Sequence, residues 1–307
     1  MPTLTQELEP NMQGVNRVDN SIRNYKKKSK LKTAWNRMKK NKPAMLGLVI
    51  ISVFICMALF ADIIANYEME ALLQEPINKL QKPSSEHWFG TDSLGRDVFA
   101  RIVHGSRVSL SIGFVIVGIS CTIGSLLGGV VAYFGGWIDT IIMRFLDVFG
   151  SIPGMLLMLA LVSALGSGID KLIIAMTIVT IPVYVRISRA SMLSIVGNEY
   201  IEAAKMSGCS NFKVIVRHLF PNSMGAILVT ATMNLAATIV TISGFSYLGI
   251  GISAPTPEWG AMLAESRSQM RYLPHLAIIP SMALLLVSLS LNMIGDGVRD
   301  ALDPRIK

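Results

Sequence analysis

The side chains that could do chemistry in this chain are few and lie far apart. Its histidines are His87, His104, His218 and His275, and none belongs to an H-E-x-x-H pair or a similar spacing that would bind zinc. The chain has neither a G-x-S-x-G turn for a nucleophilic serine nor a G-x-x-x-x-G-K-[ST] loop for the phosphates of ATP. The sequence therefore predicts no catalytic residue and no metal site, and any work driven by ATP would need a partner.

Carboxylates inside apolar segments are the other groups that could carry a function, because charge is costly within a membrane. Asp147 and Asp296 are the two candidates, and both fall near the predicted cytoplasmic ends of their segments. Arg144 precedes Asp147 by about one helical turn. We therefore expect a local ion pair at this position and not a proton relay.

The sequence predicts that these side chains are carried by long apolar helices and the loops between them. The composition is 51% hydrophobic and 16% charged, which suits a lipid bilayer better than water. Runs of about 20 apolar residues can cross the hydrocarbon core, and there they must be helical. Pro153 and Pro182 are the positions where the third and fourth of these helices would kink. The fold class is all-α integral membrane protein, with six predicted spans at residues 44–66, 109–134, 140–165, 172–189, 225–250 and 276–294.

The distribution of basic residues predicts the orientation. Residues 1–43 form an arm rich in Lys and Arg, and such residues stay on the cytoplasmic side. We expect both termini in the cytoplasm, an external loop at 67–108, and a core of five further spans at 109–307. An arm that meets anionic lipid explains the net charge of +8 without nucleic acid. Three free thiols are expected, at Cys56, Cys121 and Cys209.

A polar insert at 198–222 separates the fourth and fifth spans and faces the cytoplasm in this topology. Asn198 and Ser210 are suited to cap two short helices, and Gly208 can supply the left-handed residue between them. Pro221 is expected to end the second helix ahead of the fifth span. That second helix carries an apolar stripe with helical spacing, which predicts a surface that a partner covers: Phe212, Ile215, Val216 and Leu219.

The insert resembles a known coupling motif. Glu202-Ala203-Ala204, three residues, Gly208 and then Pro221 resemble the E-A-A-x3-G-x9-I-x-L-P motif of permease subunits in binding-protein-dependent ABC importers. His218 and Phe220 stand where the general motif has Ile and Leu, but RHLFPN is similar to the form in the dipeptide and oligopeptide branch. The resemblance implies that the insert docks into ATPase subunits through Glu202, Ala203, Ala204, Gly208, Phe212, Ile215, Leu219 and Pro221.

Three further segments are similar to the same branch. They are His87–Leu110, Ser246–Arg267 and Gly295–Arg305, and their pattern is that of the second permease of a pair. The first of them can also be interpreted as a capped interfacial helix, with Asp92 accepting backbone hydrogens and Val98, Phe99 and Ile102 resting on lipid. The motif residues in this external segment are Thr91, Asp92, Gly95, Arg96 and Asp97.

The resemblance implies a type I permease fold with a cytoplasmic helix-turn-helix coupling loop, in a bacterial inner membrane. Expected partners are a sister permease, two cytoplasmic ATPases that bind ATP and Mg, an external substrate-binding protein, and membrane lipid. Dipeptides or oligopeptides are the implied substrates. Nickel, a metallophore or glutathione remains the alternative within this architecture. A stand-alone channel or a membrane enzyme is the rival interpretation, but a passive pore needs no docking loop and an enzyme needs a catalytic set.

Overall fold

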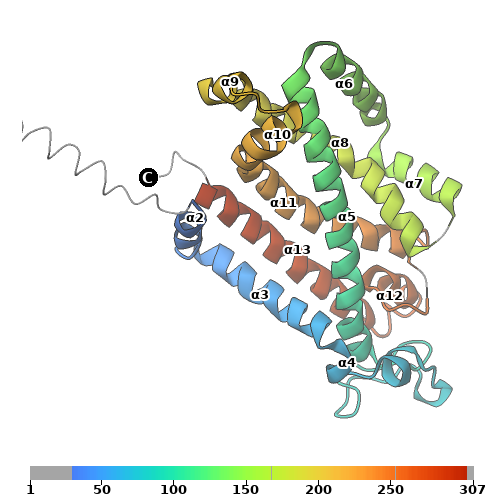
Figure 1. The fold of residues 1–307 in the computed structure, drawn as a ribbon. Coiled ribbons are helices and arrows are strands. Elements are labelled where there is room, and N and C mark those ends of the chain that lie inside the picture. The colour runs from blue at the N-terminus through green and yellow to red at the C-terminus, as the bar shows by residue number, and fades with distance from the viewer. Residues whose placement is uncertain (1–29, 167, 253, 303–307) are drawn as a thin grey trace, which may run out of the picture.

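The structure is a computed structural model that describes residues 30–166, 168–252 and 254–302. Helices are the regular elements of this part of the chain, which contains no β-strand (Figure 1). In chain order they are α2 (Lys30–Met38), α3 (Lys42–Leu59), α4 (Ala61–Ile64), η1 (Tyr67–Leu72), η2 (Pro76–Asn78), α5 (Val98–Phe134), α6 (Gly136–Ser151), α7 (Gly154–Leu165), α8 (Ile169–Val196), α9 (Glu199–Met206), α10 (Asn211–Val214), η3 (Ile215–Leu219), α11 (Phe220–Tyr247), α12 (Trp259–Ser266) and α13 (His275–Leu302).

Five helices are long and apolar enough to cross a membrane: α3, α5, α8, α13 and the continuous helix Asn211–Tyr247. Helices α6 and α7 make a sixth span only if they are counted together, because they are bent by 90°. The predicted third span at 140–165 is therefore two helices. Pro153 lacks an amide hydrogen and disfavours helical geometry at Ile152, which is extended with φ −90° and ψ 127°. Pro182, by contrast, lies inside the unbroken helix α8.

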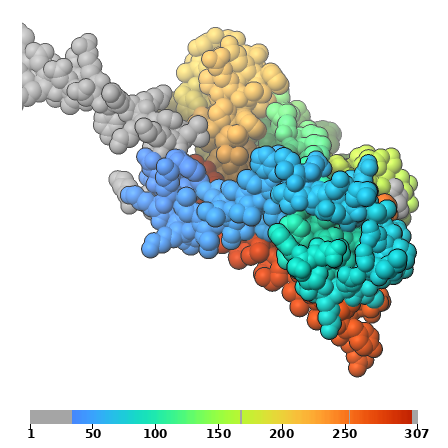
Figure 2. Space-filling view, turned by 90° about the horizontal axis from the view of Figure 1, so that it is seen from below, coloured from blue at the N-terminus to red at the C-terminus, as the bar shows by residue number. Residues whose placement is uncertain are grey.

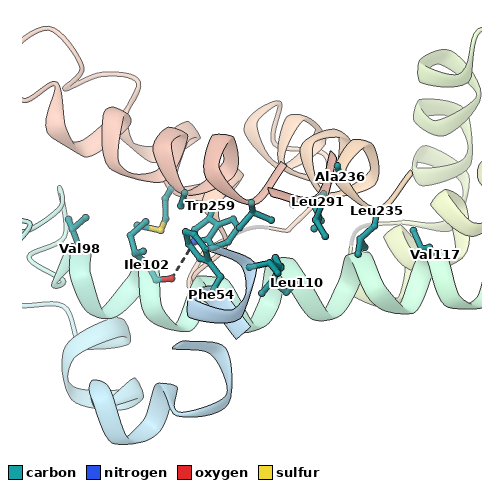
Figure 3. Packing of buried hydrophobic residues seen from close by; sticks show 14 of the residues in the cluster. Phe54, Val98, Ile102, Leu110, Val117, Leu235, Ala236, Trp259 and Leu291 are labelled. Carbon is teal, nitrogen blue, oxygen red and sulfur yellow. Dashed lines mark hydrogen bonds between the residues drawn. The ribbon is translucent and has the colours of Figure 1, made fainter. Parts of the chain in front are cut away.

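The main core lies where α3, α5, α11, α12 and α13 meet (Figure 3). Trp259 of α12 is fully buried at its centre and packs edge-on against Phe54, with ring centroids 5.7 Å apart. Its indole nitrogen donates a hydrogen bond of 3.3 Å to the carbonyl of Ile102. Because a buried indole N–H needs an acceptor, this bond and the apolar contacts together fix α12 against α5.

Helices α5 and α8 pack closely because two glycines leave room for the partner backbone. A Cβ atom at Gly128 would lie 2.7 Å from the carbonyl oxygen of Val185, and one at Gly124 would lie 2.9 Å from that of Ile181. Both distances are too short for real contacts. The sequence interpretation that Gly124 and Gly128 permit close helix approach agrees with this geometry.

The two ends of the helical body differ in what they carry. Helices α2, α9 and α10 and the C-terminal end of α13 lie toward the upper left of Figure 1, whereas α4 and the segment that leads to α5 lie at the bottom. Figure 2, seen from below, shows this segment in cyan covering a large part of that face. Within the described residues, Cys56, Cys121 and Cys209 are free, as predicted.

The start of α5 corrects one expectation. There is no separate interfacial helix at this point, because Asp97 caps α5 itself by accepting a 2.8 Å hydrogen bond from the amide of Ala100. Val98 and Ile102 are buried in the main core and do not rest on lipid. The apolar face that a lone helix would have shown to the bilayer is covered by α12 and α13 instead.

Candidate functional site

Helices α9, α10 and η3 form a compact projection, here called the coupling element (residues 199–219). Gly208 adopts φ +78° between its two helices, a conformation that suits glycine. Its amide donates to the carbonyl of Lys205 at 3.0 Å, and the amide of Cys209 donates to that of Ala204 at 3.1 Å. These bonds end α9 as predicted and set the angle at which α10 leaves.

The coupling element runs into the fifth span without a break, which corrects the role expected of Pro221. This proline lies in the first turn of α11, where a missing amide hydrogen is tolerated. The preceding turn is a π-helix, in which the amide of Phe220 donates to the carbonyl of Ile215. Asn198 and Ser210 occupy the capping positions, although neither side chain makes a capping hydrogen bond. A continuous helix can transmit displacement of the coupling element into the span.

Burial divides the predicted apolar stripe in two. Ile215 and Leu219 are 4% and 0% exposed and pack inside this chain against Met192 and Ile201, so in this conformation they offer nothing to a partner. Phe212 is 73% exposed and Met206 is 88% exposed. The two faces of the second helix differ because one face packs against α8 and α11 of this chain, which leaves only the other face exposed. The outer surface of the element includes Tyr200, Glu202, Ala203, Met206 and Phe212, together with the basic side chains of Lys205, Lys213 and Arg217, while Ala204 is half-buried.

Contacts with α5 hold the coupling element in place. The hydroxyl of Tyr133 donates a 2.8 Å hydrogen bond to the side-chain oxygen of Asn211. The ammonium of Lys205 lies 4.7 Å from the centre of the Tyr133 ring, within the range of a cation–π interaction. One residue at the end of α5 therefore contacts both helices of the element.

At the opposite end, in the segment that the predicted topology places outside the cell, four charged side chains form an ion-pair network, here called the external network: Asp92, Arg96, Arg101 and Glu265. Asp92 accepts from the Nε atom of Arg96 at 2.7 Å and from Nη1 of Arg101 at 2.6 Å. Glu265 of α12 accepts from both arginines at 2.5 Å. Both guanidinium groups are buried, and two carboxylates balance two cations, as buried charge requires.

The other residues of the external motif shape the same segment. Asp92 also accepts from the amides of Leu94 and Arg96, which confirms that it binds backbone hydrogens. Gly95 has φ +85° and passes so close to Glu75 that a Cβ atom would collide with its carbonyl group. The hydroxyl of Thr91 is hydrogen-bonded to the Asn78 carbonyl, and Asp97 pairs with Nδ1 of His87 at 2.8 Å.

A cavity of about 560 Å³ lies between α7, α8 and α11. Its wall is mostly apolar, and none of the described residues that line it is charged. Thr180 and Thr241 donate their hydroxyl hydrogens to helix carbonyls at 2.7 and 2.8 Å, so they present acceptor lone pairs to the cavity. Its lining includes Met155, Met158, Thr180, Asn234, Thr238 and Thr241.

Comparison with known proteins decides the family. Residues 122–307, more than half of the chain, match the binding-protein-dependent transport system inner membrane component. This chain belongs to that family. Residues 29–83 of the permease match the N-terminal transmembrane domain of oligopeptide transport permease C. The permease is thus a multi-pass protein of the inner membrane, a transmembrane subunit of an ABC importer with the type I fold.

Two relatives and one solved structure resemble the permease. The dipeptide transport system permease protein DppC of Alkalihalophilus pseudofirmus is 42% identical over 283 residues, which cover 92% of each chain. The glutathione transport system permease protein GsiD of Escherichia coli O157:H7 is also 42% identical, over 89% of this chain and 90% of the other. A chain of the inward-facing MetNI methionine ABC transporter matches with a TM-score of 0.52 and 20% identity, over 66% of this chain and 95% of that one. This last likeness concerns the fold alone.

The ion pair expected for Asp147 needs correction. Asp147 pairs with Arg186 of α8 at 3.1 Å, and not with Arg144 of its own helix. The bend between α6 and α7 brings α6 alongside α8, which no local spacing reveals. Glu258, the residue that caps α12, is fully buried and accepts from the hydroxyl of Ser243 at 2.7 Å.

Sequence reasoning also missed functional candidates in the permease. Arg101 and Glu265 of the external network lie 164 residues apart, so only the fold could bring them together. The cavity had a detectable signal, because Asn234, Thr238 and Thr241 follow the i, i+4, i+7 spacing of one helix face within an apolar span.

Proposed function

We propose that this permease forms, with a sister permease, the translocation pathway of an ABC importer for dipeptides or oligopeptides. Two cytoplasmic ATPases would bind ATP and Mg, an external substrate-binding protein would deliver the substrate, and this chain would catalyse no reaction. The observation that carries the proposal is the coupling element, which projects from the spans and whose second helix continues into α11 without a break. In the proposed orientation, both termini of the permease and the coupling element face the cytoplasm.

The exposed part of the coupling element is suited to protein contact. Phe212 and Met206 are large apolar side chains that remain exposed on this element, which also exposes the carboxylate of Glu202 and the cations of Lys205, Lys213 and Arg217. Apolar anchors with a charged neighbour are typical of interface centres and rims. The buried half of the stripe, Ile215 and Leu219, would transmit force to α8 and α11 and would not contact the ATPase.

The cavity between α7, α8 and α11 is the proposed part of the pathway. Acceptor oxygens from Thr180 and Thr241 fit the amide hydrogens of a peptide backbone. The described lining carries no charge, so it favours neither sign of side-chain charge, and selection among peptides would fall to the binding protein. Each nucleotide state would shift the balance between inward and outward forms only by its differential affinity for them.

Glutathione is the second candidate substrate, because the GsiD relatives are as similar in identity as DppC. Both substrates contain peptide bonds, whose amide hydrogens the acceptor oxygens of Thr180 and Thr241 can bind. Uptake by proteoliposomes that contain the cognate sister permease, ATPases and binding protein separates them when a dipeptide, an oligopeptide, glutathione and a nickel chelate are offered. ATP-dependent uptake of the nickel chelate alone, or of none of these substrates, would overturn the proposal.

Replacement of Gly208 by Val tests the coupling role. The left-handed conformation costs a β-branched residue roughly 1–2 kcal/mol, so the second helix would be re-aimed. We expect normal membrane insertion, weaker co-purification of the ATPases and reduced uptake. Gly118→Val is the control, because Gly118 lies within helix α5, outside the coupling element and its junctions, and no atom lies within 4 Å of its Cβ position. Equal docking and transport by both variants would show that the element does not couple.

A further inference from the structure

Helix α6 is attached to the rest of the chain in an unusual way. Leu146 is the only one of its 16 residues that is buried. Trp137, Phe145 and Val148 are all more than half exposed. Because α6 buries so little apolar surface within this chain, polar contacts decide how it is held.

Two ion pairs connect α6 to α8. Arg189 forms a two-point contact with Asp139, in which Nε and Nη2 donate to the two carboxylate oxygens at 2.7 and 2.6 Å. Arg186 donates through Nη2 to Asp147 at 3.1 Å and to the carbonyl of Leu146 at 3.2 Å. The Arg189 pair is the more protected and the two-point geometry is the stronger one, so it is the principal link.

The spacing of these pairs fixes the direction of α6. The two arginines are three residues apart, about 4.5 Å along α8, whereas the two aspartates are eight residues apart, about 12 Å along α6. Two separated points of attachment set the tilt of a helix, which a single contact does not. Gly150 supports the arrangement, because a Cβ atom there would lie 2.9 Å from Nη2 of Arg186.

Both ends of α6 are breaks in the helical backbone. Gly135 and Gly136 join it to α5 with φ +60° and +51°, and nothing lies within 4 Å of either Cβ position. These glycines therefore serve conformation and not close packing. At the other end, Ile152 and Pro153 make the 90° bend into α7. Hinges at both ends allow α6 to turn as a unit, guided by its contacts with α8.

Helix α8 connects the two ion pairs to the coupling element. Helix α8 ends at Val196, and α9 of the coupling element begins three residues later at Glu199. Helix α7, which follows α6, contributes Met155 and Met158 to the cavity. A continuous route therefore runs from α9 through α8, the two ion pairs and α6 to the cavity wall.

We propose that Arg189 and Arg186 are positioning residues that transmit movement of the coupling element through Asp139 and Asp147 to α6 and α7. The inference rests on the proposed function, since it explains how that movement reaches the cavity. Neither arginine is placed in contact with the substrate or the ATPases. Loss of the pairs lets α8 move without α6, so ATP hydrolysis continues while the pathway fails to respond.

The test compares transport with ATP hydrolysis in proteoliposomes that contain the complete importer. Arg189→Gln and Asp139→Asn remove the principal pair, and the double exchange Asp139→Arg with Arg189→Asp restores it in reverse. We expect each single variant to lower the amount of substrate imported per ATP by about tenfold, a typical coupling factor. The exchange should recover most of this ratio. Arg189→Lys keeps the charge but not the planar two-point contact, and should give an intermediate ratio.

Asp170→Asn is the matched control, because it removes an aspartate that pairs with Lys171 at the far end of α8, away from α6. It should leave the ratio unchanged. An unchanged ratio in Arg189→Gln and Asp139→Asn would overturn the inference while the proposed function stands. Parallel loss of assembly, hydrolysis and uptake, with no recovery in the exchange, would also overturn it, since that shows a folding role. If the parent complex shows no ATP-dependent uptake, the proposed function fails and the inference fails with it.

Discussion

At the scale of single residues, the external ion-pair network is the most demanding arrangement in the chain. Arg96 and Arg101 have side chains that are almost wholly buried, and each depends on Asp92 and Glu265 for its charge balance. Removal of one member of a buried pair leaves an uncompensated charge, whereas an exposed pair contributes little. Stability of the external end should therefore be sensitive to these four residues.

We predict that Asp92→Ala destabilises the protein by about 3–5 kcal/mol, because it leaves both arginines short of a carboxylate and frees two backbone amides. The measurement is the fraction of detergent-solubilised protein that stays monodisperse after heating. Lys171→Met, which breaks an exposed pair, should behave like the parent. Equal heat resistance of the Asp92 variant would show that the network does not hold this end together.

At the scale of elements, the contact between α5 and α8 depends on glycine. A side chain at Gly128 would collide with the backbone of Val185 and Arg189, and backbone atoms cannot rotate away. We predict that Gly128→Val forces the helices apart and abolishes stable protein in the membrane. Gly118→Val is the control on the same helix, because no atom lies within 4 Å of its Cβ position. Immunoblots of membrane fractions and heat resistance in detergent measure both; similar amounts of the two variants would contradict the packing argument.

At the scale of the whole molecule, the two ends should face opposite sides of the membrane. Ser85 is exposed in the segment before α5, and Met206 is exposed in the coupling element. In a background without Cys56, Cys121 and Cys209, we predict that Ser85→Cys reacts with an impermeant maleimide in intact cells. Met206→Cys should react only after the cells are permeabilised. Labelling of position 206 in intact cells would reverse the proposed topology.

The purified permease should not hydrolyse ATP when its partners are absent, because the chain contains no phosphate-binding loop. Phosphate release by the isolated chain is the measurement, and the assembled importer is the positive control. Hydrolysis in a preparation shown to be free of ATPase subunits would contradict the proposed division of labour.

Features that depend on local chemistry could be predicted from the residues alone. Apolar length and the need to satisfy backbone groups in lipid predict the spans, and Gly208 supplies a left-handed turn that few other residues adopt. The side chains that meet across different helices could not be predicted in this way. The tertiary structure turned Ile215 and Leu219 inward, gave Asp147 its partner Arg186, and joined Arg96 to Glu265 across 169 residues. Such contacts depend on how helices cross and bend. The spacing of residues within one helix does not determine these crossing angles and bends.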